Sequence, residues 1–168
     1  MSLSKGSVRI SMDAVITDMS QPLGMAIGNS LEVIEAIETL QGKRAGRLLE
    51  VCLELGARML VASEVSANLD DARYRLQDAL SSGQALQKLA QMIEAQGGDA
   101  ACTQDPWALP VAPLRATITA PEDGYLSRAD ALTLGRAAMA MGAGRVRKED
   151  SIDLSCGIVL AKSIGDRV

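Results

Sequence analysis

The chain has 168 residues, with 48% hydrophobic residues, 23% charged residues and a net charge of -4, which suits one or one and a half soluble globular domains. The negative charge and the lack of a Lys/Arg cluster argue against a nucleic-acid partner. No apolar run approaches the roughly 20 residues of a membrane helix, so the composition also argues against a membrane partner.

Histidine and cysteine usage restricts the possible chemistry. The chain has no histidine, so general acid-base work and metal binding must use carboxylates, lysines, hydroxyls or backbone groups. Its cysteines, Cys52, Cys102 and Cys156, are odd in number and lack CxxC spacing. They are predicted to be buried free thiols, and the protein is predicted to be cytoplasmic. Residues 1–3 are typical of a short leader.

The first predicted elements are a strand and a loop. Residues 14–17 are β-branched in part and predict a short strand. Residues 22–28 contain Pro22, Gly24 and Gly28, and they predict a loop of the kind that holds ligands.

A helix follows over about residues 30–41. Asn29 is its predicted N-cap, and Glu32 stands in the capping-box position. Glu32, Glu35 and Glu38 recur every three residues along one side. This spacing by itself predicts a solvated helix face.

Three more helices are predicted before residue 98, and they are interpreted as scaffold without binding chemistry. They are expected over about residues 47–66, 68–81 and 86–96. The first of them should be packed on more than one flank. Because the chain has no Phe, one Trp and two Tyr, the core must be aliphatic.

Residues 99–113 interrupt the helical pattern and carry three of the five prolines, so they predict a linker. Beyond it, residues 114–120 and 154–162 read as strands on either side of one helix at about 130–141. The predicted fold class is therefore α+β. A mainly helical lobe with a short strand (residues 1–98) precedes the linker, and a partial β-rich C-terminal domain with one helix (residues 114–168) follows it.

One long motif runs through the loop and the helix after it. Residues 17–24 read Thr-Asp-Met-Ser-Gln-Pro-Leu-Gly, and residues 27–29 and 31–33 continue the motif. Further motifs follow in order at residues 96–99, 120–124, 142–145, 148–150 and 157–160. Together they resemble the TDMNQPLG...GNALEV segment, and the segments after it, of the thymidine phosphorylase and pyrimidine-nucleoside phosphorylase family. The resemblance spans about residues 14–168.

The resemblance implies a fragment made of part of the α/β phosphorylase domain and part of the C-terminal domain. The family cleaves the N-glycosidic bond of a pyrimidine nucleoside with inorganic phosphate, to give a free base and a pentose 1-phosphate, and its full-length members are homodimers. The family's phosphate loop and base-contacting residues have no counterparts in this sequence. No catalytic or substrate-binding residue is therefore assigned, and the fragment alone is expected to be inactive.

The resemblance also implies a cation site. Family members are similar in holding a monovalent cation, assigned as potassium, partly through two backbone carbonyls and one glutamate. In this chain those positions are Leu23, Ala26 and Glu35, and the other ligands would lie outside it. Oxygen ligands of this kind suit a hard cation.

Two non-enzymatic alternatives stay open. Residues 120–124 and 165–168 also resemble the strand turns of biotinyl and lipoyl carrier domains, but neither Lys148 nor Lys162 lies in an acceptor turn. A purely structural interaction module is compatible with the helices, but it leaves the motif at residues 22–35 unexplained.

Overall fold

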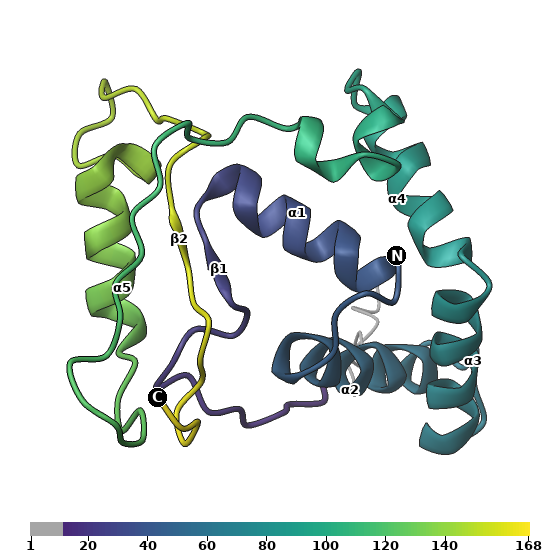
Figure 1. Cartoon of the computed structure of the whole chain (residues 1–168). Helices are drawn as coiled ribbons and strands as arrows, with labels where there is room; N and C mark the ends of the chain where they lie inside the picture. The colour runs from purple at the N-terminus through teal and green to yellow at the C-terminus, as the bar shows by residue number, and fades with distance from the viewer. Residues whose placement is uncertain (1–11) are drawn as a thin grey trace, which may run out of the picture.

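The computed structural model describes residues 12–168, so the predicted leader at residues 1–3 lies outside the described part. The described chain is mostly helical with a small two-stranded sheet, which confirms the α+β class (Figure 1). Its elements, in chain order, are β1 (Ala26–Ile27), α1 (Asn29–Leu40), α2 (Arg47–Ala62), α3 (Leu69–Ser81), α4 (Gln84–Ala95), the 3-10 turns η1 (Ala100–Thr103) and η2 (Pro106–Ala108), α5 (Ala131–Ala138), the π-helical turn η3 (Met139–Ala143) and β2 (Ile158–Val159).

The helix boundaries follow local capping signals. Asn68 accepts a hydrogen bond from the backbone N–H of Asp71 at the start of α3. Asp130 does the same for Thr133 at the start of α5. Both starts were predicted, because an N-cap side chain and the N–H that it binds lie within one turn of each other. Helix α2 is shorter than predicted and ends at Ala62.

The sheet joins the two ends of the described chain. β1 and β2 pair antiparallel, with Ala26 opposite Val159 and Ile27 opposite Ile158. Figure 1 shows α1 on one side of this pair and α5 on the other, while α2, α3 and α4 follow one another beyond α1. The division at residues 99–113 stays a prediction, and β1–β2 pairing links the segments on either side of it.

The strands differ in place and extent from those predicted. The prediction of a strand at residues 14–17 is wrong, because those residues carry no strand pairing in the described part. The short strand of the helical region is β1 instead. Among described residues after 113, strand pairing is limited to β2 and a bridge between Tyr125 and Arg167. A strand needs a neighbour to bond with, and a β-branched run alone does not supply one.

The buried core is small and aliphatic, as the composition predicted. Ile34 and Ile37 of α1 are its largest buried apolar side chains among the described residues. Helix α2 buries Ala57 while Met59 is 71% exposed, so the prediction that α2 packs on several flanks is wrong. Cys52, on the same helix, is exposed rather than buried.

No helix of residues 12–168 combines the length and apolarity needed to cross a membrane.

Candidate functional site

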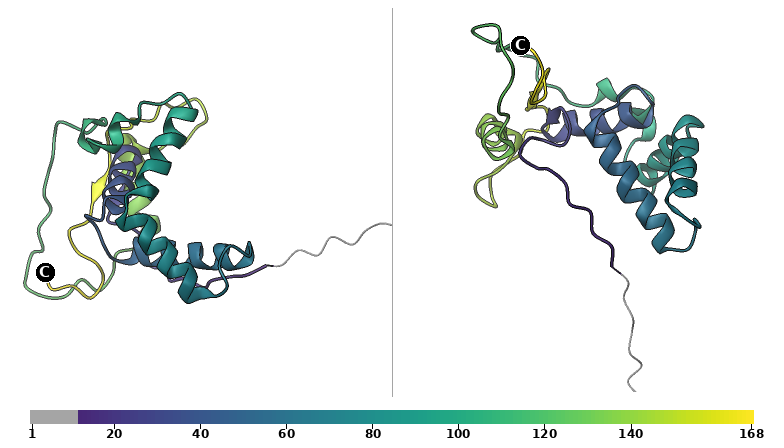
Figure 2. Two further views of the ribbon diagram at one scale, coloured as in Figure 1. Left: turned by 90° about the vertical axis from the view of Figure 1, so that its right-hand side faces the viewer. Right: turned by 90° about the horizontal axis from the view of Figure 1, so that it is seen from below.

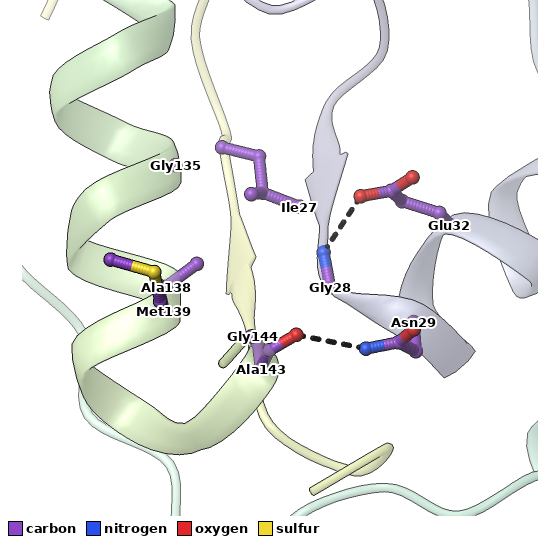
Figure 3. Close-up of a pocket in the computed structure, with 9 residues that line it drawn as sticks. All are labelled: Ile27, Gly28, Asn29, Glu32, Gly135, Ala138, Met139, Ala143 and Gly144. Atoms are coloured by element: carbon purple, nitrogen blue, oxygen red, sulfur yellow. Dashed lines mark hydrogen bonds between the residues drawn. The ribbon is translucent and has the colours of Figure 1, made fainter. Parts of the chain in front are cut away.

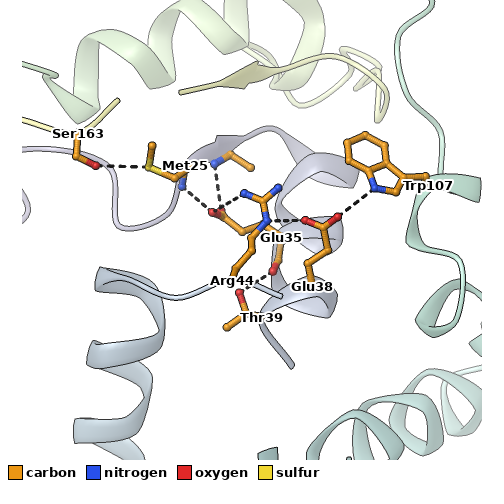
Figure 4. A network of polar contacts seen from close by, with 8 residues as sticks. Met25, Glu35, Glu38, Thr39, Arg44, Trp107 and Ser163 are labelled. Atoms are coloured by element: carbon orange, nitrogen blue, oxygen red, sulfur yellow. Dashed lines mark hydrogen bonds and ion pairs between the residues drawn. The ribbon is translucent and has the colours of Figure 1, made fainter. Parts of the chain in front are cut away.

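Glu35 points from the middle of α1 into the loop that precedes the helix. Its Oε1 accepts a hydrogen bond from the N–H of Met25 at 2.7 Å, and its Oε2 accepts one from the N–H of Ala26 at 3.0 Å (Figure 4). The side chain is only 7% exposed, and Arg44 Nη1 lies 3.8 Å from Oε1. The prediction of a solvated helix face, made from the glutamate spacing, is therefore wrong for Glu35. This residue is a buried carboxylate that binds the backbone of the loop.

Gly24 leaves the space that this carboxylate fills. A Cβ built on Gly24 would lie 2.2 Å from Oε2 of Glu35 and 2.9 Å from its Cδ. No side chain larger than hydrogen fits there while Glu35 keeps its position, so the glycine is required for close approach rather than for an unusual backbone angle.

Strand pairing fixes the direction of the Ala26 carbonyl. Leu160 N–H donates to the Met25 carbonyl at 2.7 Å, while the Met25 N–H goes to Glu35 rather than back to Leu160. Ala26, opposite Val159, lies between this contact and the Ile27–Ile158 pair, and because hydrogen-bonded and non-hydrogen-bonded positions alternate along antiparallel strands, we expect its N–H and C=O to point away from β2. The N–H reaches Glu35, so the carbonyl lies on the same side of the strand as the carboxylate.

The three residues proposed for a cation lie together. Leu23, Ala26 and Glu35 all line one pocket of about 350 Å³ between the loop, α1 and the starts of α2 and α5. Within residues 12–168 no group of three or more His, Cys, Asp or Glu is placed to hold a metal. One carboxylate together with backbone carbonyls is a set of oxygen ligands that suits a hard cation of low charge better than it suits zinc.

The start of α1 differs from the prediction. The N-cap is Gly28, not Asn29, and Glu32 Oε1 accepts from the Gly28 N–H at 2.9 Å. Asn29 instead donates from Nδ2 to the Ala143 carbonyl at 2.9 Å, which ties α1 to η3 across a pocket of about 190 Å³ (Figure 3). The capping pattern located the helix start to within one residue, but the distant partner of Asn29 was not detectable from local spacing.

Glu38 forms a further polar contact on this side of α1. It binds Arg44 Nε and accepts a hydrogen bond from Trp107 Nε1 at 3.0 Å (Figure 4). Burial raises the pKa of the Glu38 carboxyl, but hydrogen bonds from Arg44 and Trp107, with the charges of Arg44 and Lys43, outweigh it and hold the pKa below the ordinary value. Sequence reasoning missed Arg44 and Trp107, because neither stands at a helical spacing from Glu38.

This contact predicts a pH-dependent signal from Trp107, the only tryptophan in the chain. Because the folded pKa of Glu38 is depressed, its contribution to stability is present above the unfolded pKa and is lost as pH falls through the folded pKa. We expect Trp107 fluorescence to change with a midpoint below the ordinary glutamate pKa. Glu38→Gln should remove this transition, and the exposed control Glu94→Gln should keep it. An unchanged midpoint in Glu38→Gln would exclude the assignment.

Comparison with known proteins defines the class first. Residues 125–168 match the family model of the pyrimidine nucleoside phosphorylase C-terminal domain. The chain is 49% identical to the pyrimidine-nucleoside phosphorylase of Geobacillus stearothermophilus, over 92% of this chain and 36% of the relative. It is 46% identical to that of Bacillus subtilis, over 99% of this chain and 40% of the relative, and 47% identical to that of Staphylococcus epidermidis, over 92% and 36%.

By sequence, the chain belongs to the pyrimidine-nucleoside phosphorylase family. It spans 36–40% of the length of these relatives, so it corresponds to about two fifths of such a protein. The family that the motifs at residues 17–33 and downstream resemble is thereby confirmed, and neither carrier nor interaction-module alternatives are favoured.

Proposed function

We propose that this chain is part of a pyrimidine-nucleoside phosphorylase. In the whole protein, inorganic phosphate would attack the anomeric carbon of a pyrimidine nucleoside such as thymidine or uridine, and the base would leave with the electrons of the N-glycosidic bond. The products are a free base and a pentose 1-phosphate. The observation that carries this proposal is the 46–49% identity over 92–99% of the chain to relatives with that name.

The contribution of this chain to such a reaction is positional. Charge stabilisation and orientation supply most of the acceleration in a displacement of this type. The described residues provide a loop whose backbone is fixed by the buried Glu35 carboxylate and by pairing with β2. We assign them no catalytic or substrate-contacting role, and we propose that the chain by itself does not turn over nucleoside.

A chimera tests this function. We expect the Geobacillus stearothermophilus enzyme to keep at least about a tenth of its kcat/KM for thymidine or uridine when its 155-residue matching segment is replaced by this chain's sequence, because the two segments are 49% identical and should share one fold. The isolated chain, assayed with nucleoside and phosphate, should release no base above the buffer control. A folded chimera without phosphorolysis, or repurified isolated chain with turnover, would contradict the proposal.

We further propose that the whole protein binds a potassium ion through the carbonyls of Leu23 and Ala26 and the carboxylate of Glu35. Support comes from the shared pocket and from the direction of the Ala26 carbonyl. Glu35 already accepts two backbone hydrogen bonds, but each carboxylate oxygen has a second lone pair for an ion.

The proposed partners of the whole protein are a pyrimidine nucleoside, phosphate and a second copy of the whole protein. We propose no nucleic-acid or membrane partner, and we propose that the protein acts in the cytoplasm.

The cation proposal predicts a K⁺-specific effect at one glutamate. In the chimera, Glu35→Gln should raise the K⁺ concentration needed for half-maximal activity by at least about tenfold, because one charged oxygen ligand is lost. The control Glu94→Gln, exposed on α4, should respond to K⁺ like the unsubstituted chimera. Equal K⁺ dependence in all three would assign Glu35 a structural role only.

A further inference from the structure

Arg44 lies between two carboxylates of α1, those of Glu35 and Glu38 (Figure 4). Its Nε donates a hydrogen bond to Glu38 Oε2, whereas its Nη1 lies 3.8 Å from Glu35 Oε1, beyond the length of a hydrogen bond. Glu38 is itself held in place, because Trp107 Nε1 donates to its other oxygen at 3.0 Å. The arginine is therefore bound to Glu38 and lies beside Glu35 without bonding to it.

The two oxygens of Glu35 face different surroundings. Oε1 lies near Arg44 and the Met25 N–H, and neither of these residues lines the pocket of about 350 Å³. Oε2 accepts from the N–H of Ala26, which does line that pocket. The pocket therefore lies on the Oε2 side of the carboxylate and the guanidinium on the Oε1 side. From there the guanidinium can affect an ion through its charge without taking a ligand position.

Two carboxylates share this one guanidinium, which leaves one negative charge without an ion pair among residues 12–168. The Glu35 side chain is 7% exposed and that of Glu38 is 14% exposed, so water compensates neither charge fully. Lys43, near Glu38, is exposed, and so is Glu32 on the wall of the pocket, so water screens both of their charges. The group therefore lacks one positive charge, which is the charge of a monovalent cation.

We propose that Arg44 sets the charge preference of the cation site, so that the site takes a monovalent rather than a divalent ion. This inference rests on the proposed site at Leu23, Ala26 and Glu35, and it concerns a residue that is not one of the ligands. The guanidinium repels a cation held by Glu35, and Glu38 limits the repulsion by neutralising part of its charge. Because Coulomb energy is proportional to the charge of the ion, the repulsion is twice as large for a divalent ion.

Ion-dependent unfolding of the chimera tests this assignment without measuring activity. The dissociation constant is obtained from the rise in stability with ion concentration, while choline chloride keeps the ionic strength constant. The Arg44 side chain is 33% exposed, so its charge is partly screened. Arg44→Gln should therefore tighten K⁺ binding about three- to tenfold. For Ba²⁺, a divalent ion of nearly the same size, the factor should be the square of that for K⁺, about 10- to 100-fold.

Glu38→Gln should act in the opposite direction. It leaves the charge of Arg44 uncompensated beside Glu35, so K⁺ should bind about three- to tenfold more weakly. Two variants with opposite effects on the same ion separate a charge effect from a general loss of stability, which would weaken ion binding in both.

Two further variants are controls. Arg44→Lys keeps the positive charge, so K⁺ should bind within about twofold of the unsubstituted chimera, the range of an ordinary surface substitution. Arg75→Gln removes the same charge from an arginine that pairs with Asp71 on α3, and it should also bind K⁺ within about twofold. Figure 1 and the right-hand view of Figure 2 show α3 at the opposite end of the molecule from the strands.

Three results would overturn the proposal while leaving the cation site in place, because K⁺ still binds in each. They are equal K⁺ affinity in Arg44→Gln and Arg75→Gln, equal factors for K⁺ and Ba²⁺, and a change in Arg44→Lys as large as that in Arg44→Gln. A chimera that K⁺ does not stabilise would overturn the cation site and this inference together. Arg44→Met, a second neutral variant, decides the question if Arg44→Gln does not fold.

Discussion

Gly28→Ala and Gly157→Ala should each separate β1 from β2. A Cβ on Gly157 would lie 2.2 Å from the Ile27 carbonyl oxygen, and one on Gly28 would lie 2.4 Å from that of Cys156. These neighbours are backbone atoms of the paired segment, so they cannot rotate away as a side chain can. Gly28 also has φ +133°, where an L residue is strained.

The expected size of this effect is about 2–4 kcal/mol of local stability, from overpacking and backbone strain together. It should appear as roughly 30- to 1,000-fold faster hydrogen exchange at the Leu160 amide, which donates to the Met25 carbonyl. Gly135→Ala is the matched control, since nothing lies within 4 Å of its Cβ position in α5 and alanine favours the helix. Leu160 exchange as slow in Gly157→Ala as in Gly135→Ala would disprove the close approach.

Glu35→Ala should release the loop before α1. The substitution leaves the half-buried N–H groups of Met25 and Ala26 without their acceptor. Each unsatisfied group costs about 1–3 kcal/mol, so we expect a total of about 2–5 kcal/mol in the local opening free energy.

The measurement is hydrogen exchange of those two amides, resolved by NMR. Both should exchange at least about 30-fold faster in Glu35→Ala, as this free energy requires. Glu94→Ala, at an exposed position near the end of α4, should leave both amides within about 0.5 kcal/mol of the unsubstituted chain. If the two amides stay protected in Glu35→Ala, the loop is held by β2 rather than by the carboxylate.

Part of the candidate site was predictable because its signals are local or carried by the family motif. The motif led to Leu23, Ala26 and Glu35, and the structure places the three around one pocket. Spacing alone predicted the opposite for Glu35, because a three-residue repeat of glutamates reports which side of a helix they share and not what that side faces. Arg44 and Trp107 could not be found from either source.

The sequence by itself determined the helices, the aliphatic core and the family. Caps such as Asn68 and Asp130 bind N–H groups three residues away, so their consequences are readable without knowing the rest of the fold. Only the tertiary structure decided that β1 pairs with β2 and that Glu35 is buried. Strand pairing and burial depend on segments from opposite ends of the chain, and no local pattern encodes which of them will meet.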